Sequence, residues 1–202
     1  MGNGKNLRGI IGTTMNSDEK YPEGQMQRNV TDYINDSIDR LKEWCSLLEL
    51  IKTKREELPK HKKVFNSLID VYSRDMINVL SNVLDQNKQT SSLFTLLSYI
   101  ETNKESTNYR KKIDKIKLEV NDYIITRGAH TGHFNTKHNS YPNDRLPLNT
   151  PISVNQEFMT GIVNRIEDLF WKMKEEAKID GVFVSTHNWT MRDAFSDFIS
   201  SL

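Results

Sequence analysis

The sequence predicts an all-α fold, a bundle of five to six helices with a long histidine-containing loop between the fourth and fifth helices. Apolar residues recur at steps of three and four over most of the chain, and no stretch shows the alternation of a half-buried strand. Hydrophobic residues make up 36% and charged residues 27%, with a mean hydropathy of −0.64. This polar composition is typical of long helices with wide solvated faces.

The chain has 202 residues, a length that suits one domain. Residues 1–25 are rich in glycine and show no sustained period, so we expect them to form a flexible N-terminal arm. We expect residues 26–202 to form the helical domain.

The first predicted helix starts near Val30 and ends before Pro59. Thr31 or Asn29 is expected to cap its start. Cys45 lies on its apolar face, which predicts a small buried side chain rather than a nucleophile. The residues that define this face follow steps of four and three: Val30, Ile34, Ile38, Leu41, Cys45 and Leu48.

The second predicted helix starts near Lys60 and ends at the polar residues 85–87. Thr90 or Ser91 is expected to cap a short third helix that extends to Ile100. A linker over residues 103–107 follows it.

The fourth predicted helix carries Ile113 to Ile124 on its apolar face, and its last turn reaches Arg127. Residues 128–151 contain glycines and prolines that break the helical pattern, which predicts a long loop.

Ser153 with Gln156 is then expected to form a capping box at the start of a fifth helix, which ends at Gly181. Thr190 is expected to cap a final helix near the C-terminus.

Several classes of protein are excluded by composition and motifs. The single Cys45 excludes a disulfide framework and a zinc site built on paired cysteines. The 28 Lys and Arg residues balance 27 Asp and Glu residues, so the whole chain is not a polycation.

No apolar stretch is long enough to span a membrane and no hydrophobic leader is present, so we expect a cytoplasmic chain without a membrane partner. The sequence contains no phosphate-binding loop, dinucleotide fingerprint or metalloprotease motif, and we expect no cofactor and no metal.

Three histidines, His130, His133 and His138, lie close together in the predicted loop, just after Arg127. Three interpretations compete: solvated side chains without a role, a metal site, or acid–base chemistry. Spacings of three and five in a glycine-containing loop allow metal ligation, although no carboxylate lies nearby in sequence. For acid–base chemistry, histidine exchanges protons near pH 7, and the arginine fork binds phosphate oxygens. Arg127 and His133 would then suffice to cleave RNA without a metal.

The Arg-x5-His spacing of Arg127 and His133, at the end of an amphipathic helix, resembles the Arg-x4–6-His motif of the HEPN superfamily. The order of elements over residues 30–175 is similar to the abortive-infection branch of that superfamily, as are the residues of two stretches, 80–85 and 91–97. Gly128 replaces the polar residue that often follows the motif arginine, and either His133 or His130 is the motif histidine.

This resemblance implies a homodimer whose two motif helices face each other across a composite cleft, with each histidine near the partner's arginine. It implies a ribonuclease that acts in phage defence or as a toxin. The alternative is a helical module without catalysis, which regulates or protects a partner protein in a defence pair.

Basic residues offer a surface for an RNA partner. Lysines and arginines outnumber acidic residues in residues 52–63 and 104–119. On the fourth helix, the predicted RNA-binding residues precede the Arg–His pair, where phosphate contacts are useful: Arg110, Lys111, Lys112 and Lys115.

Aromatic residues have two interpretations. Tyr109 and Tyr123 either stack on RNA bases or belong to the core. Trp44, Trp171 and Trp189 are expected in the core.

Overall fold

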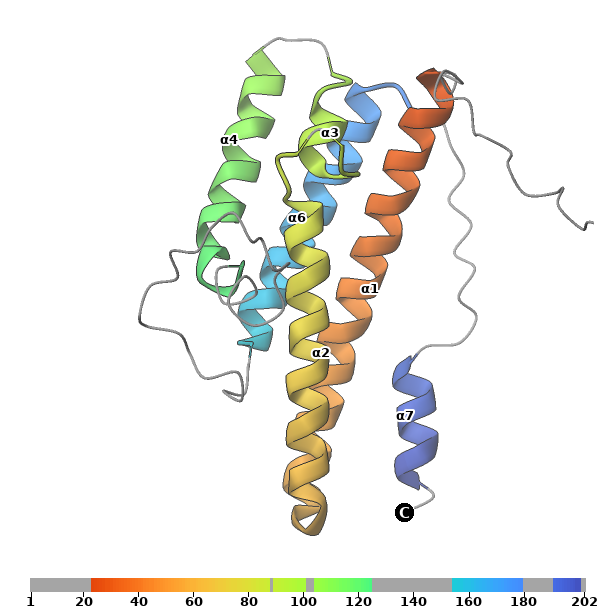
Figure 1. Ribbon diagram of the computed structural model, residues 1–202, viewed down its shortest axis with the longest axis vertical. Coiled ribbons are helices and arrows are strands. Elements are labelled where there is room, and N and C mark those ends of the chain that lie inside the picture. Colours follow the sequence, from red (N-terminus) through yellow and green to blue (C-terminus); the bar gives the residue numbers. More distant parts are fainter. Residues whose placement is uncertain (1–22, 88, 101–103, 125–153, 180–190, 201–202) are drawn as a thin grey trace, which may run out of the picture.

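The computed structural model describes residues 23–87, 89–100, 104–124, 154–179 and 191–200, and this part of the chain is helical without strands. It confirms the predicted all-α bundle (Figure 1). The elements, in chain order, are α1 (Glu23–Glu57), the 3-10 helix η1 (Pro59–His61), α2 (Lys62–Val83), α3 (Leu93–Leu97), α4 (Lys104–Glu119), α6 (Gln156–Glu176) and α7 (Met191–Ser200).

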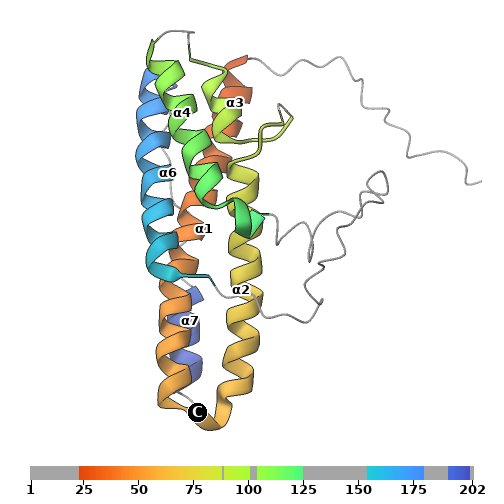
Figure 2. The same ribbon diagram turned by 90° about the vertical axis from the view of Figure 1, so that its left-hand side faces the viewer.

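Helices α1 and α2 form a long antiparallel hairpin that serves as the frame of the bundle (Figures 1 and 2). The 35 residues of α1 correspond to a length of about 52 Å at 1.5 Å per residue. Pro59, which lacks an amide hydrogen, stands at the start of η1 and ends α1 as predicted. Helices α3, α4 and α6 lie on the upper half of the hairpin, and α7 lies beside its lower half.

The start of α1 differs from the prediction. The helix begins at Glu23, ahead of Val30, so neither Thr31 nor Asn29 caps it. Thr31 is instead buried inside the helix, where its Oγ1 donates to the carbonyl oxygens of Gln27 (3.2 Å) and Arg28 (2.8 Å). A buried threonine hydroxyl within a helix finds its partner one turn back in this way.

Helix α3 is capped by Ser92, so the predicted caps, Thr90 and Ser91, are wrong. The Oγ of Ser92 accepts from the amide of Thr95 (3.3 Å) and donates to the carbonyl of Asp85 (2.7 Å). This hydroxyl therefore satisfies a free amide at the helix start and ties α3 to the chain that follows α2.

Helix α4 begins at Lys104, within the predicted linker over residues 103–107. It is followed by a turn at Val120 and a further helical stretch over residues 121–124. Helix α6 is capped by Asn155, whose side chain accepts from the amide of Phe158 (3.0 Å). The Ser153–Gln156 capping box is therefore wrong, because Asn155 occupies the capping position.

The core fills the space between α1 and the helices around it. Ile34, Leu41 and Leu48 of α1 are fully buried, and Cys45 is buried as predicted. Trp44 is buried, but Trp171 is 43% exposed and stands beside Lys174 at 5.2 Å, so the core prediction for Trp171 is wrong. Trp171 follows the buried Phe170 and lies on the outer side of α6. Trp189 lies outside the described residues.

Helix α7 packs on the lower half of the α1–α2 hairpin. Phe195 meets Phe65 edge to face at 6.4 Å, and the Nη1 of Arg192 donates to the Oγ of Ser46 (2.6 Å). Phe198 remains 52% exposed. The residue predicted to cap this helix, Thr190, lies outside the described residues.

Candidate functional site

The predicted catalytic residues Arg127, His130 and His133 lie in residues 125–153, outside the described part of the chain. His138, the third histidine of the metal interpretation, lies there as well. The structure does describe the two elements that border this segment: residues 121–124 before it, and the start of α6 after it.

These two borders lie side by side. The Tyr123 ring stacks on Phe158, with a centroid distance of 6.1 Å and an interplanar angle of 27°. The amide of Asn155 donates to the Tyr123 hydroxyl over 3.5 Å, so the ring is fixed at both its face and its oxygen. Residue 124, where the described chain stops, and Val154, where it resumes, therefore lie close together.

Burial bears on the two interpretations of the tyrosines. Tyr109 is only 8% exposed and belongs to the core, so it offers no face to a base. Tyr123 is partly buried and one face of its ring is covered by Phe158.

The predicted RNA-binding residues are all exposed and span the solvent side of α4, which we call the α4 basic face: Arg110, Lys111, Lys112 and Lys115. The opposite side of the helix carries Ile113 and Ile116, which are buried. The period of 3.6 residues thus places the four basic groups toward solvent on the helix that leads toward Arg127.

A groove of about 720 Å³ lies between α3 and α4, at the edge of the α4 basic face. Its volume falls within the range of small-molecule pockets, roughly 300–1,000 Å³. Hydroxyl, amide and guanidinium groups line it beside apolar side chains. The lining residues are Gln86, Phe94, Thr95, Leu97, Ser98, Ile100, Ser106, Thr107 and Arg110.

Phe94 is the aromatic group of this groove and lies among cations. The guanidinium carbon of Arg110 lies 5.6 Å, and the Nζ of Lys117 5.7 Å, from the centre of its ring. The Nε of Arg110 is 3.8 Å from Asp114, a contact that is weak because both side chains are largely exposed. The sequence places Phe94 within the predicted short third helix but does not indicate this role, since the cations come from another helix.

A second groove, of about 430 Å³, lies between α4 and α6 close to Tyr123. Arg165 on α6 binds both carboxylate oxygens of Glu119 on α4, at 2.5 and 3.2 Å. The hydrogen bonds from Arg165 lower the pKa of the Glu119 carboxyl group, and the charges of Arg165 and Lys115 act in the same direction. Arg165 is therefore committed to a structural pair.

Two further groups have a shifted pKa, the Cys45 thiol and the Lys52 amine. Burial raises the pKa of the Cys45 thiol, which lies at a small pocket of about 200 Å³ between α1 and α6. Burial, helped by the charge of Arg55, lowers the pKa of Lys52, whose Nζ donates to the carbonyl of Val154 (3.1 Å). Cys45 is buried and Lys52 is partly buried, and neither belongs to the α4 basic face.

Among the described residues, no group of three or more His, Cys, Asp or Glu side chains is placed to hold a metal ion. Within the same residues, no helix is long and apolar enough to cross a membrane.

Comparison of the chain with protein-family models, with curated proteins and with solved structures gave no match.

Proposed function

We propose that this protein is a metal-independent endoribonuclease of the HEPN type that acts in the cytoplasm, in phage defence or as a toxin. The α4 basic face carries this proposal. It places four exposed cations on the helix that leads toward the Arg–His pair, which suits a protein that holds the phosphates of RNA beside its reacting group.

In the proposed reaction, His133 takes the proton of a ribose 2′-hydroxyl, and the 2′-oxygen attacks the adjacent phosphorus. Arg127 offsets the negative charge that develops on the phosphate oxygens. The bond to the 5′-oxygen of the next nucleotide breaks, that oxygen takes a proton, and a 2′,3′-cyclic phosphate remains. His130 assists this proton transfer, and a homodimer brings one copy's histidine near the other copy's arginine.

The described residues supply binding. Lys111, Lys112 and Lys115 contact successive phosphates, while the groove between α3 and α4 admits a nucleotide beside Arg110 and Phe94. An arginine fork and an aromatic ring are the groups that single-stranded RNA sites use for phosphate and base.

The test is cleavage of a labelled RNA in excess EDTA by the wild-type chain, His133→Ala and Arg127→Ala. We expect cleavage by the wild type and its loss in both variants. His138→Ala is the matched control, because it removes a histidine of the same segment outside the Arg-x5-His motif, and it should retain activity. Equal cleavage by His133→Ala would remove the catalytic assignment.

A second candidate is a helical interaction module without catalysis. Val64 and Val71 are 54% and 52% exposed on α2, seven residues and therefore about two turns apart on one face. An exposed apolar face of this kind is suited to a second copy or a partner protein in a defence pair. Light scattering of the wild type and of Val64→Ser/Val71→Ser, together with the cleavage assay, distinguishes this module from the ribonuclease. The module is supported if the variant loses a dimer that the wild type forms and the wild type cleaves no RNA.

A further inference from the structure

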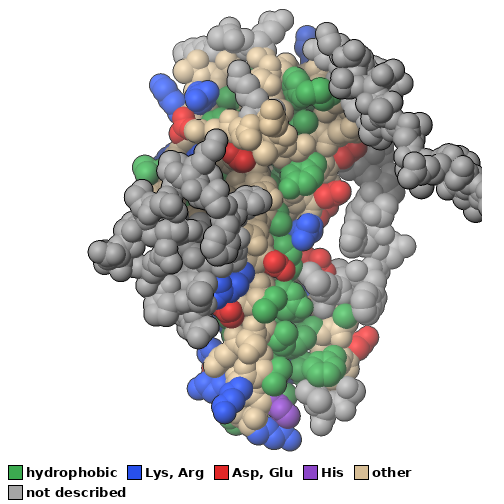
Figure 3. Space-filling view, viewed as in Figure 1, with side chains coloured by type: hydrophobic (Ala, Val, Ile, Leu, Met, Phe, Trp, Pro, Cys, Tyr) green, Lys and Arg blue, Asp and Glu red, His purple; other side chains and the backbone are tan. Residues whose placement is uncertain are grey.

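The turn that joins α1 and α2 carries a concentration of positive charge. Residues 52–63, here called the hairpin tip, contain six Lys or Arg residues and two Glu residues, a net charge of +4 in a chain whose net charge is +1. Figure 3 shows these blue side chains gathered around the lower end of the molecule, next to the single histidine of the view. This end lies opposite the end of the bundle that carries α3.

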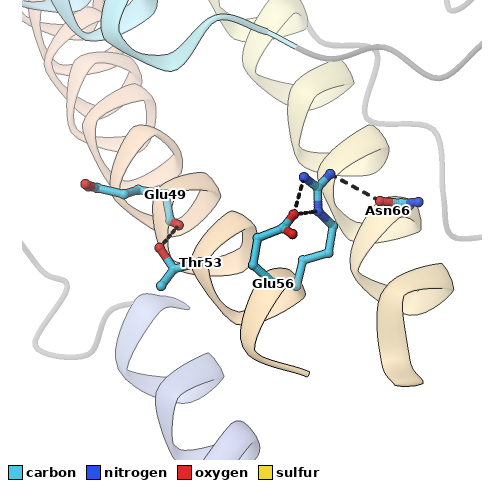
Figure 4. Close-up of polar contacts among 5 residues, drawn as sticks. Glu49, Thr53, Glu56 and Asn66 are labelled. Carbon is cyan, nitrogen blue, oxygen red and sulfur yellow. Dashed lines mark hydrogen bonds and ion pairs between the residues drawn. The ribbon is translucent and has the colours of Figure 1, made fainter. Parts of the chain in front are cut away.

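The two acidic residues of the tip are already paired. Both Nε (2.9 Å) and Nη2 (2.7 Å) of Arg55 donate to Glu56, and its Nη1 donates to Asn66 (3.4 Å), as Figure 4 shows. Lys54 binds Glu57 at 2.6 Å. Each glutamate is therefore paired with a basic residue of α1, and neither glutamate pairs with the lysines on the other side of the turn.

Lys52 donates to the carbonyl of Val154, which leaves three lysines at the tip: Lys60, Lys62 and Lys63. All three are exposed, and the first turn of α2 contains no acidic residue. Among the described residues, no carboxylate forms an ion pair with any of them. Adjacent like charges repel, and cations are unfavourable in the first turn of a helix, so these lysines do not serve the stability of the hairpin.

The tip and the α4 basic face lie far apart on the same molecule. Gln86, just beyond the C-terminal end of α2, contacts Asp114 of α4 at 3.5 Å, whereas the tip lies at the N-terminal end of α2. The 22 residues of α2 span about 33 Å. In Figure 2, α4 runs along the side of the upper half and the tip forms the lower end.

We propose that the hairpin tip is a second phosphate-binding surface for RNA, so that a strand held on the α4 basic face continues to Lys60, Lys62 and Lys63. The inference rests on the proposed function, since it extends the same RNA site. RNA fits better than a membrane because a flexible polyanion reaches both the side and the end of the bundle, whereas a flat lipid surface does not. At about 3.4 Å per stacked nucleotide, the separation corresponds to about ten nucleotides.

The test compares Lys62→Gln/Lys63→Gln with the matched control Lys172→Gln/Lys174→Gln, which removes two lysines from α6. The probes are fluorescent 2′-O-methyl RNAs of 6 and 20 nucleotides, which lack the attacking hydroxyl and stay intact. Binding is measured by anisotropy at salt concentrations from 50 to 200 mM.

For the 20-mer, we expect the tip variant to lose about 1.4 from the slope of log affinity against log salt, about 0.7 per lost phosphate contact on a single strand. As the salt concentration rises from 50 to 200 mM, the ratio of the wild-type affinity to the tip-variant affinity should then fall about sevenfold. For the 6-mer, which is too short to reach both surfaces, the tip variant should match the wild type. The control should match the wild type with both RNAs.

The outcomes separate the two proposals. A tip variant that binds the 20-mer with the wild-type slope overturns the inference and leaves the proposed function standing. A wild type that binds neither RNA overturns both. If the tip substitutions weaken binding to anionic phospholipid vesicles and leave RNA binding unchanged, the tip recognises lipid and the inference is wrong. Thermal unfolding of the tip variant, expected to match or exceed the wild type, excludes misfolding as the cause.

Discussion

Ser73 provides a direct test of how α2 packs in the bundle. Its side chain is fully buried, and its Oγ has no hydrogen-bond partner among the described residues. A buried hydroxyl without a partner loses its bonds to water and gains none in return. Ser73→Ala removes this unpaired hydroxyl and should therefore stabilise the protein.

The expected gain has two parts. Relief of the unpaired hydroxyl contributes about 1 kcal/mol, the lower end of the range for such groups. Alanine is the better helix former by about 0.5 kcal/mol. The sum of about 1.5 kcal/mol corresponds to a rise of about 3–6 °C in Tm for a chain of this size.

Ser67→Ala is the matched control, because Ser67 is exposed on the same helix and its Oγ donates to the carbonyl of Lys63 (3.2 Å). Its free energy of unfolding should change by no more than about 0.5 kcal/mol. Urea unfolding followed by circular dichroism gives both values. A Ser73→Ala variant less stable than the wild type, or no more stable than Ser67→Ala, would refute the reasoning.

Three further predictions concern α4 and α6. Among the described residues, no atom beyond the local backbone of α6 lies within 4 Å of where a Cβ on Gly161 would stand. Gly161→Ala should therefore raise the free energy of unfolding by about 1 kcal/mol in thermal melts, and a lower Tm would contradict the open groove. Because the pKa of Glu119 is lowered in the fold, its pair with Arg165 stabilises above about pH 4.5 and is lost as pH falls through the folded pKa. Unfolding curves of the wild type and Glu119→Gln should therefore converge at low pH, and a constant difference would argue against the pair. The Cys45 thiol should react with a thiol reagent at pH 8 at least about tenfold more slowly in the folded chain than in urea, and equal rates would show that α1 and α6 do not cover it.

The periodic parts of the fold could be predicted from the sequence. The steps of four and three from Val30 to Leu48 identify the buried face of α1, and Pro59 marks where that helix ends. The burial of Cys45 follows from the same pattern. Such positions are predictable because a single helix face decides them, whatever packs against it.

Helix starts were less predictable, since several polar residues compete for each cap. Ser92 was missed beside Ser91, and Asn155 beside Ser153, because the cap depends on where the chain turns. The burial of Trp171 could not be predicted from its type, because its ring lies on the outer side of α6 and is 43% exposed. The cluster of Phe94 with Arg110 and Lys117 joins α3 to α4, and no local pattern contains it.

In the proposed function, RNA bound on the α4 basic face is the substrate of the Arg127–His133 pair. Steady-state cleavage kinetics in EDTA at 0.1 M salt, for the wild type and Lys111→Gln/Lys112→Gln/Lys115→Gln, measure this link. If these lysines bind the substrate and do not react with it, KM should rise by about ten- to a hundredfold while kcat stays within about twofold. An unchanged KM, or a wild type that cleaves no RNA, would contradict the account.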